Sequence, residues 1–279
     1  VIEFLINRNF RRNNKLIAIG GGITQDVTAF IASVLYRGVP WLFFPTTLLA
    51  QCDSCIGSKT SINFGTYKNQ LGGFYPPKTI YIDTGFLPTL SEADIKSGLG
   101  EMAHYFVIAG DNDFELFAQN LKKAAEYDTE VLDKLIRRSL QIKKQYIEID
   151  EFDRNKRQIF NYGHSFGHAI ETLTDYRVPH GIAVSYGIDM ANFVSMKLQL
   201  IDAQTRYKIR NVLRCLWIDF TIDDISIDKF INALKKDKKN VGNELRLILM
   251  KGMGQVFKKA IKPDDTFVRW ISEYFKNEL

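Results

Sequence analysis

The chain has 279 residues, and its 46% hydrophobic and 25% charged residues are ordinary values for a globular protein that can bury a sizeable core. It contains no unbroken apolar run of about 18 residues, so no membrane span is predicted. Its three cysteines argue against a disulfide framework and indicate a reducing compartment such as the cytoplasm, and its net charge of +5 favours a small anionic ligand or a solvated basic face over nucleic acid.

The N-terminal part alternates predicted strands with helices. After a short helix within residues 1–14, the apolar run 15–19 is typical of a buried strand. It leads into Gly20-Gly-Gly22 and a helix over 23–35. A strand, a glycine turn and a helix form the unit that binds phosphate on backbone N–H groups, although a plain tight turn explains the glycines equally well. Two further strands are expected, at 41–44 and 79–83.

The stretch 48–70 is polar and has few apolar residues for its length, so we expect it to line a site rather than a core. It carries Asp53, Lys59, Asn63, Lys68 and Asn69. Cys52 and Cys55 have a C-x-x-C spacing, but no second pair completes a zinc site, so small packing residues are the favoured interpretation.

From residue 91 the pattern becomes helical. Ser91 and Asp94 have the spacing of a capping box, and 132–149 repeats apolar residues at helical spacing. Further helices are expected at 164–173, 182–198, 204–215, 226–237 and 263–279, with a small hairpin at 245–249 and 255–257. The predicted fold class is therefore an α/β nucleotide-binding domain over 1–86, followed by a mainly helical metal- and substrate-binding domain over 87–279.

Three of the four histidines, His164, His168 and His180, lie in or shortly after the stretch 161–171. The fourth, His104, follows Glu101 by three residues. His164 and His168 are four apart and share a helix face, so both can bind one metal ion; two satisfied histidines at a helix start are the alternative. Glu101, His164 and His180 form another possible ligand set, which leaves a coordination position open for substrate.

Cationic side chains suitable for phosphate and carboxylate are spread along the chain: Lys59, Lys68, Lys143, Arg157 and Lys238. Together with a metal and a dinucleotide at the glycine turn, they suggest oxidation of an alcohol on a phosphorylated polyol. Isolated lysines such as Lys68 and Lys238 are more often solvated. Arg157 can equally pair with Glu151 or Asp153.

Several motifs follow one another along essentially the whole chain. They are Gly20-Gly-Gly-Ile-Thr-Gln-Asp26, Pro45-Thr-Thr-Leu-Leu49, Asp53-Ser-Cys-Ile-Gly-Ser-Lys-Thr60, Gly98-Leu-Gly-Glu101, Asn161-Tyr-Gly-His-Ser-Phe-Gly-His-Ala-Ile-Glu171 and His180-Gly181. In this order they resemble 3-dehydroquinate synthase and its sugar phosphate cyclase relatives. The resemblance implies a cytoplasmic homodimer of the shikimate pathway that acts on a seven-carbon phosphorylated keto-acid. The implied reaction comprises transient oxidation by NAD, β-elimination of phosphate, re-reduction and intramolecular aldol closure.

The resemblance also implies residue roles. A divalent metal, zinc or cobalt, would bind Glu101, His164 and His180. The catalytic positions are His168, Lys143, Asn161, Arg157 and Lys59. The substrate-binding positions are Arg37, which reaches the phosphate across a dimer interface, and Lys59, Lys68, Asn69, Lys143, Arg157, Asn161 and Lys238. The NAD contacts are Gly21, Gly22, Asp26, Thr46, Thr47, Asp53, Lys59, Lys68 and Thr84.

Three departures from the family pattern leave alternatives open. Its Glu-x-x-Lys appears as Glu101-Met-Ala-His104, and its Gly-Gly-Lys appears as Gly57-Ser58-Lys59. The family also has a βα portion ahead of the first strand, which we expect the N-terminal part to lack. His104 and Ser58 favour a paralogous cyclase acting on another sugar phosphate. A metal-dependent alcohol dehydrogenase and a non-catalytic remnant that does not bind NAD are the other two alternatives.

Overall fold

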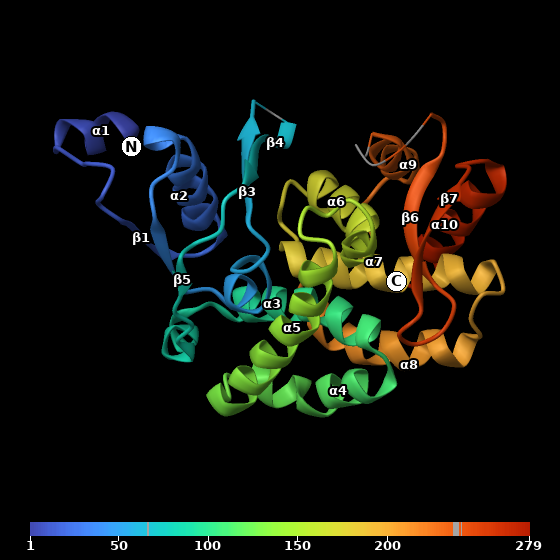
Figure 1. Cartoon of the computed structure of the whole chain (residues 1–279). Helices are drawn as coiled ribbons and strands as arrows, with labels where there is room; N and C mark the ends of the chain where they lie inside the picture. The colour runs from blue at the N-terminus through green and yellow to red at the C-terminus, as the bar shows by residue number, and fades with distance from the viewer. Residues whose placement is uncertain (66, 237–239, 241) are drawn as a thin grey trace.

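The structure, a computed structural model, describes residues 1–65, 67–236, 240 and 242–279 (Figure 1). The predicted site residue Lys238 lies outside these ranges, and the side chain of Lys68 lies outside the described part of the chain as well.

Three parallel strands form the N-terminal sheet, in the order β1 (Leu16–Gly20), β2 (Trp41–Pro45) and β5 (Thr79–Ile80). The helix α2 (Gly22–Val34) joins β1 to β2, and α1 (Ile2–Asn7) precedes the sheet. Trp41 and Phe43 are buried with residues of α2 in a small apolar core. The prediction that β1 is a buried strand is only partly right, because Ile17 and Ile19 are 59% and 61% exposed while Ala18 is buried.

The polar stretch 48–70 also differs from its prediction. Leu48, which precedes the π-helical turn η2 (Ala50–Ser54), and Cys52 within that turn are fully buried and pack in the larger apolar core. The rest forms an antiparallel hairpin that the sequence did not indicate, β3 (Lys59–Phe64) with β4 (Tyr67–Phe74). In Figure 1 this hairpin stands between the N-terminal sheet and the helical part. The stretch therefore contributes to the core as well as to the site described below.

The remainder of the described chain is mainly helical, as predicted. The long helices are α3 (Glu92–Ala109), α4 (Asp111–Ala125), α5 (Thr129–Ile149), α6 (His164–Leu173), α7 (His180–Lys197), α8 (Ala203–Leu213), α9 (Ile227–Lys235) and α10 (Asp265–Asn277). Short helical turns lie at η1 (Leu35–Arg37), η3 (Thr84–Thr89), η4 (Lys156–Asn161) and η5 (Arg214–Leu216). The Ser91 side chain accepts the N–H of Asp94 and caps α3, and the expected hairpin is β6 (Leu245–Met250) with β7 (Val256–Ile261).

Helices α3 and α7 lie at the centre of the helical part and touch backbone to backbone. A Cβ atom on Gly100 would lie 2.2 Å from the carbonyl oxygen of Gly181, and one on Gly181 would lie 1.7 Å from that of Ser97. No larger residue fits at this crossing. The close approach brings Glu101 of α3 next to His180, the first residue of α7.

The buried apolar side chains form two clusters. The smaller cluster joins β1, β2 and α2, and the larger one runs through the helices and the β6–β7 hairpin. The division between the two predicted domains after residue 86 stays a prediction. Among the described residues, no helix combines the length and the apolar character that crossing a membrane requires.

Candidate active site

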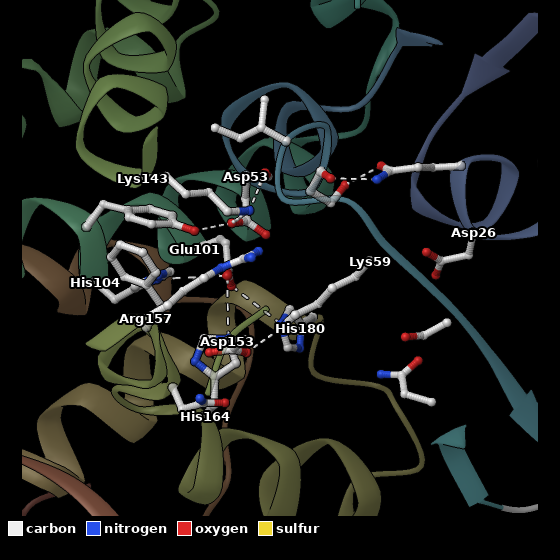
Figure 2. A pocket seen from close by; sticks show the side chains of 18 of the residues that line it. Asp26, Asp53, Lys59, Glu101, His104, Lys143, Asp153, Arg157, His164 and His180 are labelled. Carbon is white, nitrogen blue, oxygen red and sulfur yellow. Dashed lines mark hydrogen bonds and ion pairs between the residues drawn. The ribbon is translucent and has the colours of Figure 1, made fainter. Parts of the chain in front are cut away.

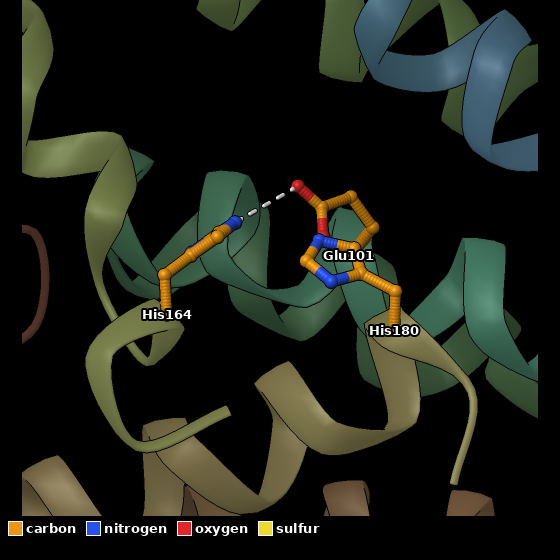
Figure 3. Close-up of side chains that lie close together, drawn as sticks. All are labelled: Glu101, His164 and His180. Atoms are coloured by element: carbon orange, nitrogen blue, oxygen red, sulfur yellow. Dashed lines mark ion pairs between the residues drawn. The ribbon is translucent and has the colours of Figure 1, made fainter. Parts of the chain in front are cut away.

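One carboxylate and two imidazoles converge where α6 and α7 begin. His164 Nε2 lies 3.5 Å from Glu101 Oε1, and His180 Nε2 lies 3.4 Å from Glu101 Oε2 (Figure 3). Glu101 is only 3% exposed, and its Oε2 accepts no hydrogen bond within the described chain. One ligand atom from each of the three residues lies within 4.8 Å of the others. A buried, unsatisfied carboxylate oxygen facing two imidazole nitrogens fits a divalent, zinc-like cation, so the three predicted ligands form a coherent set.

His168 does not join this set. It lies one turn further along α6, its ring centroid 5.6 Å from that of His164 and 5.7 Å from that of His180. Its ligand atom groups with those of Glu171 and His180 instead. The geometry of the described residues thus disfavours one cation shared by His164 and His168.

The electrostatics of the triad keep its carboxylate ionised. Burial acts to raise the pKa of Glu101, but the neighbouring imidazoles, that of His164 above all, outweigh it and hold that pKa well below its usual range. His104 behaves differently, since burial lowers its pKa to about 4. Its Nδ1 lies 3.8 Å from Glu101 Oε1, and neither ring nitrogen makes a hydrogen bond of good geometry within the described chain. A neutral imidazole therefore lies beside the triad.

A second polar cluster links α5 to the turn η2. The Lys143 ammonium donates to the backbone oxygen of Asp53 at 2.6 Å and to its Oδ1 at 2.8 Å. Burial acts to raise the pKa of Asp53, but Lys143 outweighs it and the pKa is lowered. The hydroxyl of Tyr105 donates to the same carboxylate. Tyr105 was not predicted; its position four residues after Glu101, on the same helix face, is the one indication the sequence offered.

Arg157, in η4, is 4% exposed and binds backbone rather than carboxylate. Its guanidinium donates to the carbonyl oxygen of Gly57 at 3.2 and 3.3 Å and to that of Glu151 at 2.6 Å. Asp153 pairs with Lys59 instead, so neither acid offered as a side-chain partner for Arg157 serves as one. Gly57 has φ +110°, and a Cβ atom there would lie 2.1 Å from Arg157 Nη2, so only glycine leaves room for the guanidinium.

These groups line one cavity of about 310 Å³ (Figure 2). The predicted residues on its wall are Asp26, Asp53, Lys59, Asn69, Glu101, Lys143, Arg157, Asn161, His164, His168 and His180. The sequence indicated no role for Gln25, Ser54, Ile56, Ser61, Tyr105 and Phe160, which also line it, and Asp153 was expected there only as a partner of Arg157. The wall thus combines α2, η2 and the β3–β4 hairpin with α3, α5, η4, α6 and α7. Residues from both halves of the chain build it.

The glycine turn lies at the carboxyl ends of β1 and β2, where Gly21 is the N-cap of α2. A Cβ atom on Gly21 would lie 2.8 Å from Cγ2 of Thr47, so the turn and the end of β2 are in contact. Asp26, one turn into α2, reaches the cavity, and burial raises its pKa to about 6. The other predicted positions away from the cavity wall are Gly22, Arg37, Thr46, Thr47 and Thr84.

Comparison with solved structures defines the class first. The chain superposes on 2-deoxy-scyllo-inosose synthase complexed with carbaglucose-6-phosphate, NAD+ and Co2+ with a TM-score of 0.90 and 25% identity. The match covers 99% of this chain and 77% of that one. The architecture is therefore that of a sugar phosphate cyclase.

Comparison of sequences shows which family of sugar phosphate cyclases the chain resembles. Residues 1–97 match the family model of the 3-dehydroquinate synthase N-terminal part, and residues 98–240 match that of the C-terminal part. The 3-dehydroquinate synthase of Acetivibrio thermocellus is 35% identical over 273 residues, 98% of this chain and 76% of that protein. A bifunctional 3-dehydroquinate synthase/phosphatase of Fusobacterium nucleatum subsp. nucleatum is 36% identical over all of this chain, which spans 42% of that protein. The chain belongs to the 3-dehydroquinate synthase family.

Proposed function

We propose that the chain catalyses the 3-dehydroquinate synthase reaction on a seven-carbon phosphorylated keto-acid. The reaction combines transient oxidation by NAD, β-elimination of phosphate, re-reduction and intramolecular aldol closure to a carbocycle. The observation that carries the proposal is the convergence of Glu101, His164 and His180 in a cavity that is also lined by buried cations. Identity of 35% to the 3-dehydroquinate synthase of A. thermocellus supports it.

Two groups from outside the chain belong to the proposal. Glu101, His164 and His180 would hold a divalent cation, zinc or cobalt, and the glycine turn at Gly21, with Asp26, would hold NAD. When bound, these groups supply a Lewis acid that polarises substrate oxygens and an acceptor for hydride. The cyclase whose fold this chain shares contains NAD+ and Co2+.

The chain's own side chains bind and orient the anionic substrate. Lys143 and Arg157 are 5% and 4% exposed, so their charges act in a poorly screened environment. Backbone carbonyl oxygens hold the Arg157 guanidinium and leave its net charge uncancelled. The Lys143 ammonium donates both to the backbone oxygen of Asp53 and to its carboxylate, which pairs its charge and fixes its position. Lys59 and Asn161 line the same wall and suit phosphate and carboxylate oxygens. His168 offers an imidazole at the cavity that can take or return a proton.

The assembly and location are part of the same proposal. Arg37 does not line the cavity of its own chain, so the role at the phosphate that the family resemblance implies would require a second copy of the chain. A homodimer would provide that contact. Cys52 and Cys55 are free and buried, in keeping with a cytoplasmic protein whose thiols stay reduced.

A paralogous cyclase is the second candidate function, and His104 is the observation that favours it. A neutral imidazole stands where the family pattern has a lysine, so the cavity carries one positive charge fewer. Phosphate release from the keto-acid phosphate, sedoheptulose 7-phosphate and glucose 6-phosphate, compared side by side, separates the two candidates. Net accumulation of NADH would point to an alcohol dehydrogenase, because a cyclase regenerates its NAD.

The direct test of the site is His164→Ala. We expect bound metal and phosphate release both to fall sharply, because one of three ligands is lost. The substitution Lys122→Ala, at an exposed position on α4, serves as the control and should leave both unchanged. Full metal occupancy with wild-type activity in His164→Ala would contradict the assignment of the ligands.

A further inference from the structure

His180 lies between two carboxylates that come from different helices. Its Nε2 lies 3.4 Å from Oε2 of Glu101 on α3, and its Nδ1 makes a 3.0 Å hydrogen bond with Oε2 of Glu171 on α6. Glu171 is 5% exposed, so the carboxylate is buried. It ends the longest motif of the sequence, yet neither its spacing nor the family resemblance gave it a role.

A histidine binds a cation through a neutral ring, and in that form of His180 the two carboxylates compete for its one proton. A carboxylate in its ionised form can only accept a hydrogen bond, so in the neutral ring the 3.0 Å contact with Glu171 requires the proton on Nδ1. The other nitrogen, Nε2, then presents its lone pair toward Glu101, which is the form in which a histidine binds a cation. In the opposite tautomer, Nε2–H would point at Glu101 Oε2, a buried oxygen that accepts no hydrogen bond within the described chain. Without Glu171, that oxygen would draw the proton to the wrong side of the ring.

A second cation site is the competing explanation of the same geometry. Ligand atoms of His168, Glu171 and His180 also lie within 4.8 Å of one another. A cation there would need the lone pair of His180 Nδ1, and one ring can serve two cations only after losing both protons. Glu171 Oε2 is already engaged by that ring, whereas Glu101 Oε2 accepts no hydrogen bond within the part of the chain that the structure describes. The cation site therefore lies beside Glu101, and Glu171 contacts the other ring nitrogen of His180, Nδ1.

We infer that Glu171 is a positioning residue that holds His180 in its Nδ1-protonated tautomer and so prepares Nε2 to bind a cation. The cation-binding consequence rests on the proposed function, but the tautomer itself does not. A group that accepts a hydrogen bond from the non-coordinating nitrogen of a ligand histidine typically raises metal affinity about tenfold to hundredfold. The inference therefore predicts a defect of that size in a chain whose three ligands are all intact.

The tautomer can be read directly in metal-free protein labelled with 15N-histidine. With only four histidines, long-range 1H–15N correlation spectra resolve each ring, and His180→Gln identifies the pattern that belongs to residue 180. At a pH high enough for the 15N shifts to show a neutral His180 ring, we expect Nδ1–H at His180 in the wild type. Glu171→Ala should shift this ring toward Nε2–H, and Glu171→Gln, whose amide oxygen still accepts, should restore Nδ1–H. Glu126→Gln, on an exposed carboxylate, is the matched control.

Zinc affinity, measured by competition with a chromophoric chelator, supplies the second readout. We expect a dissociation constant about 10- to 100-fold higher for Glu171→Ala, a smaller change for Glu171→Gln and none for the control. Circular dichroism checks that each variant is folded. If His180 stays Nδ1-protonated in Glu171→Ala, or if zinc affinity is unchanged after the tautomer shifts, the inference is overturned. If the wild type bound no zinc, the proposed function would fail, and the tautomer of Glu171→Ala would still decide the role of Glu171.

Discussion

The buried ion pair of Asp53 and Lys143 offers a quantitative test of how the cavity is built. The two side chains are 18% and 7% exposed, and 2.8 Å separates Lys143 Nζ from Asp53 Oδ1. At an effective dielectric constant of about 20, two unit charges at that distance attract each other by roughly 6 kcal/mol before desolvation is subtracted. The perturbation is a double-mutant cycle of Lys143→Met, Asp53→Asn and the pair together.

The contacts predict an asymmetric result. Lys143→Met leaves the buried Asp53 carboxylate with the Tyr105 hydroxyl as its remaining side-chain partner among the described residues, so we expect a loss of about 3 to 5 kcal/mol in the free energy of unfolding. Asp53→Asn should cost less, because Lys143 keeps the backbone oxygen of residue 53. The double variant should be more stable than the sum of the single losses implies, by about 0.5 to 3 kcal/mol.

Urea unfolding at several pH values is the assay. The pKa of Asp53 in the folded chain lies below its ordinary value of 3.8, so the unfolded chain binds the proton first as the pH falls. The contribution of the pair is therefore complete above about pH 5 and is lost as the pH falls through 3.8 and below. Asp53→Asn should lack this part of the pH dependence. Single losses that add within about 0.5 kcal/mol, or parallel acid profiles for wild type and Asp53→Asn, would refute the reasoning.

Three further predictions follow from single positions. Gly57→Ala should displace the guanidinium of Arg157 and lower kcat/KM, measured by steady-state kinetics, by about 100-fold. Gly73→Ala is the control, because a Cβ atom there meets nothing within 4 Å. Asp26→Asn should raise the free energy of unfolding by about 1 to 2 kcal/mol at pH 7 but not at pH 4. The reason is that burial raises the pKa of Asp26 from 3.8 to about 6, so its ionised form destabilises the fold as the pH rises. Equal urea stability of both proteins at pH 7 would count against this. His104→Lys should increase phosphate release from the keto-acid phosphate relative to glucose 6-phosphate, and an unchanged ratio would remove His104 as a determinant of substrate choice.

Much of the helical part follows from the sequence. Apolar residues at helical spacing located α5, and α6 begins and ends at the predicted residues 164 and 173. The N-cap of α3 at Ser91 was also predictable, because a capping side chain bonds its own segment. The metal ligands could also be predicted from the sequence, because few side-chain types can bind zinc and the chain has only four histidines.

The folded chain alone decided which of these groups face one another. Asp53 and Lys143 are 90 residues apart, and no local pattern connects them. Arg157 binds the carbonyl oxygen of Gly57, a group that every residue carries, so no side chain in the sequence could identify that partner. The β3–β4 hairpin and the exposure of Ile17 likewise depend on which surfaces the rest of the chain covers. Residue type limits the chemistry available to a site, whereas the competition of Glu101 and Glu171 for one proton of His180 arises only when three helices bring them together.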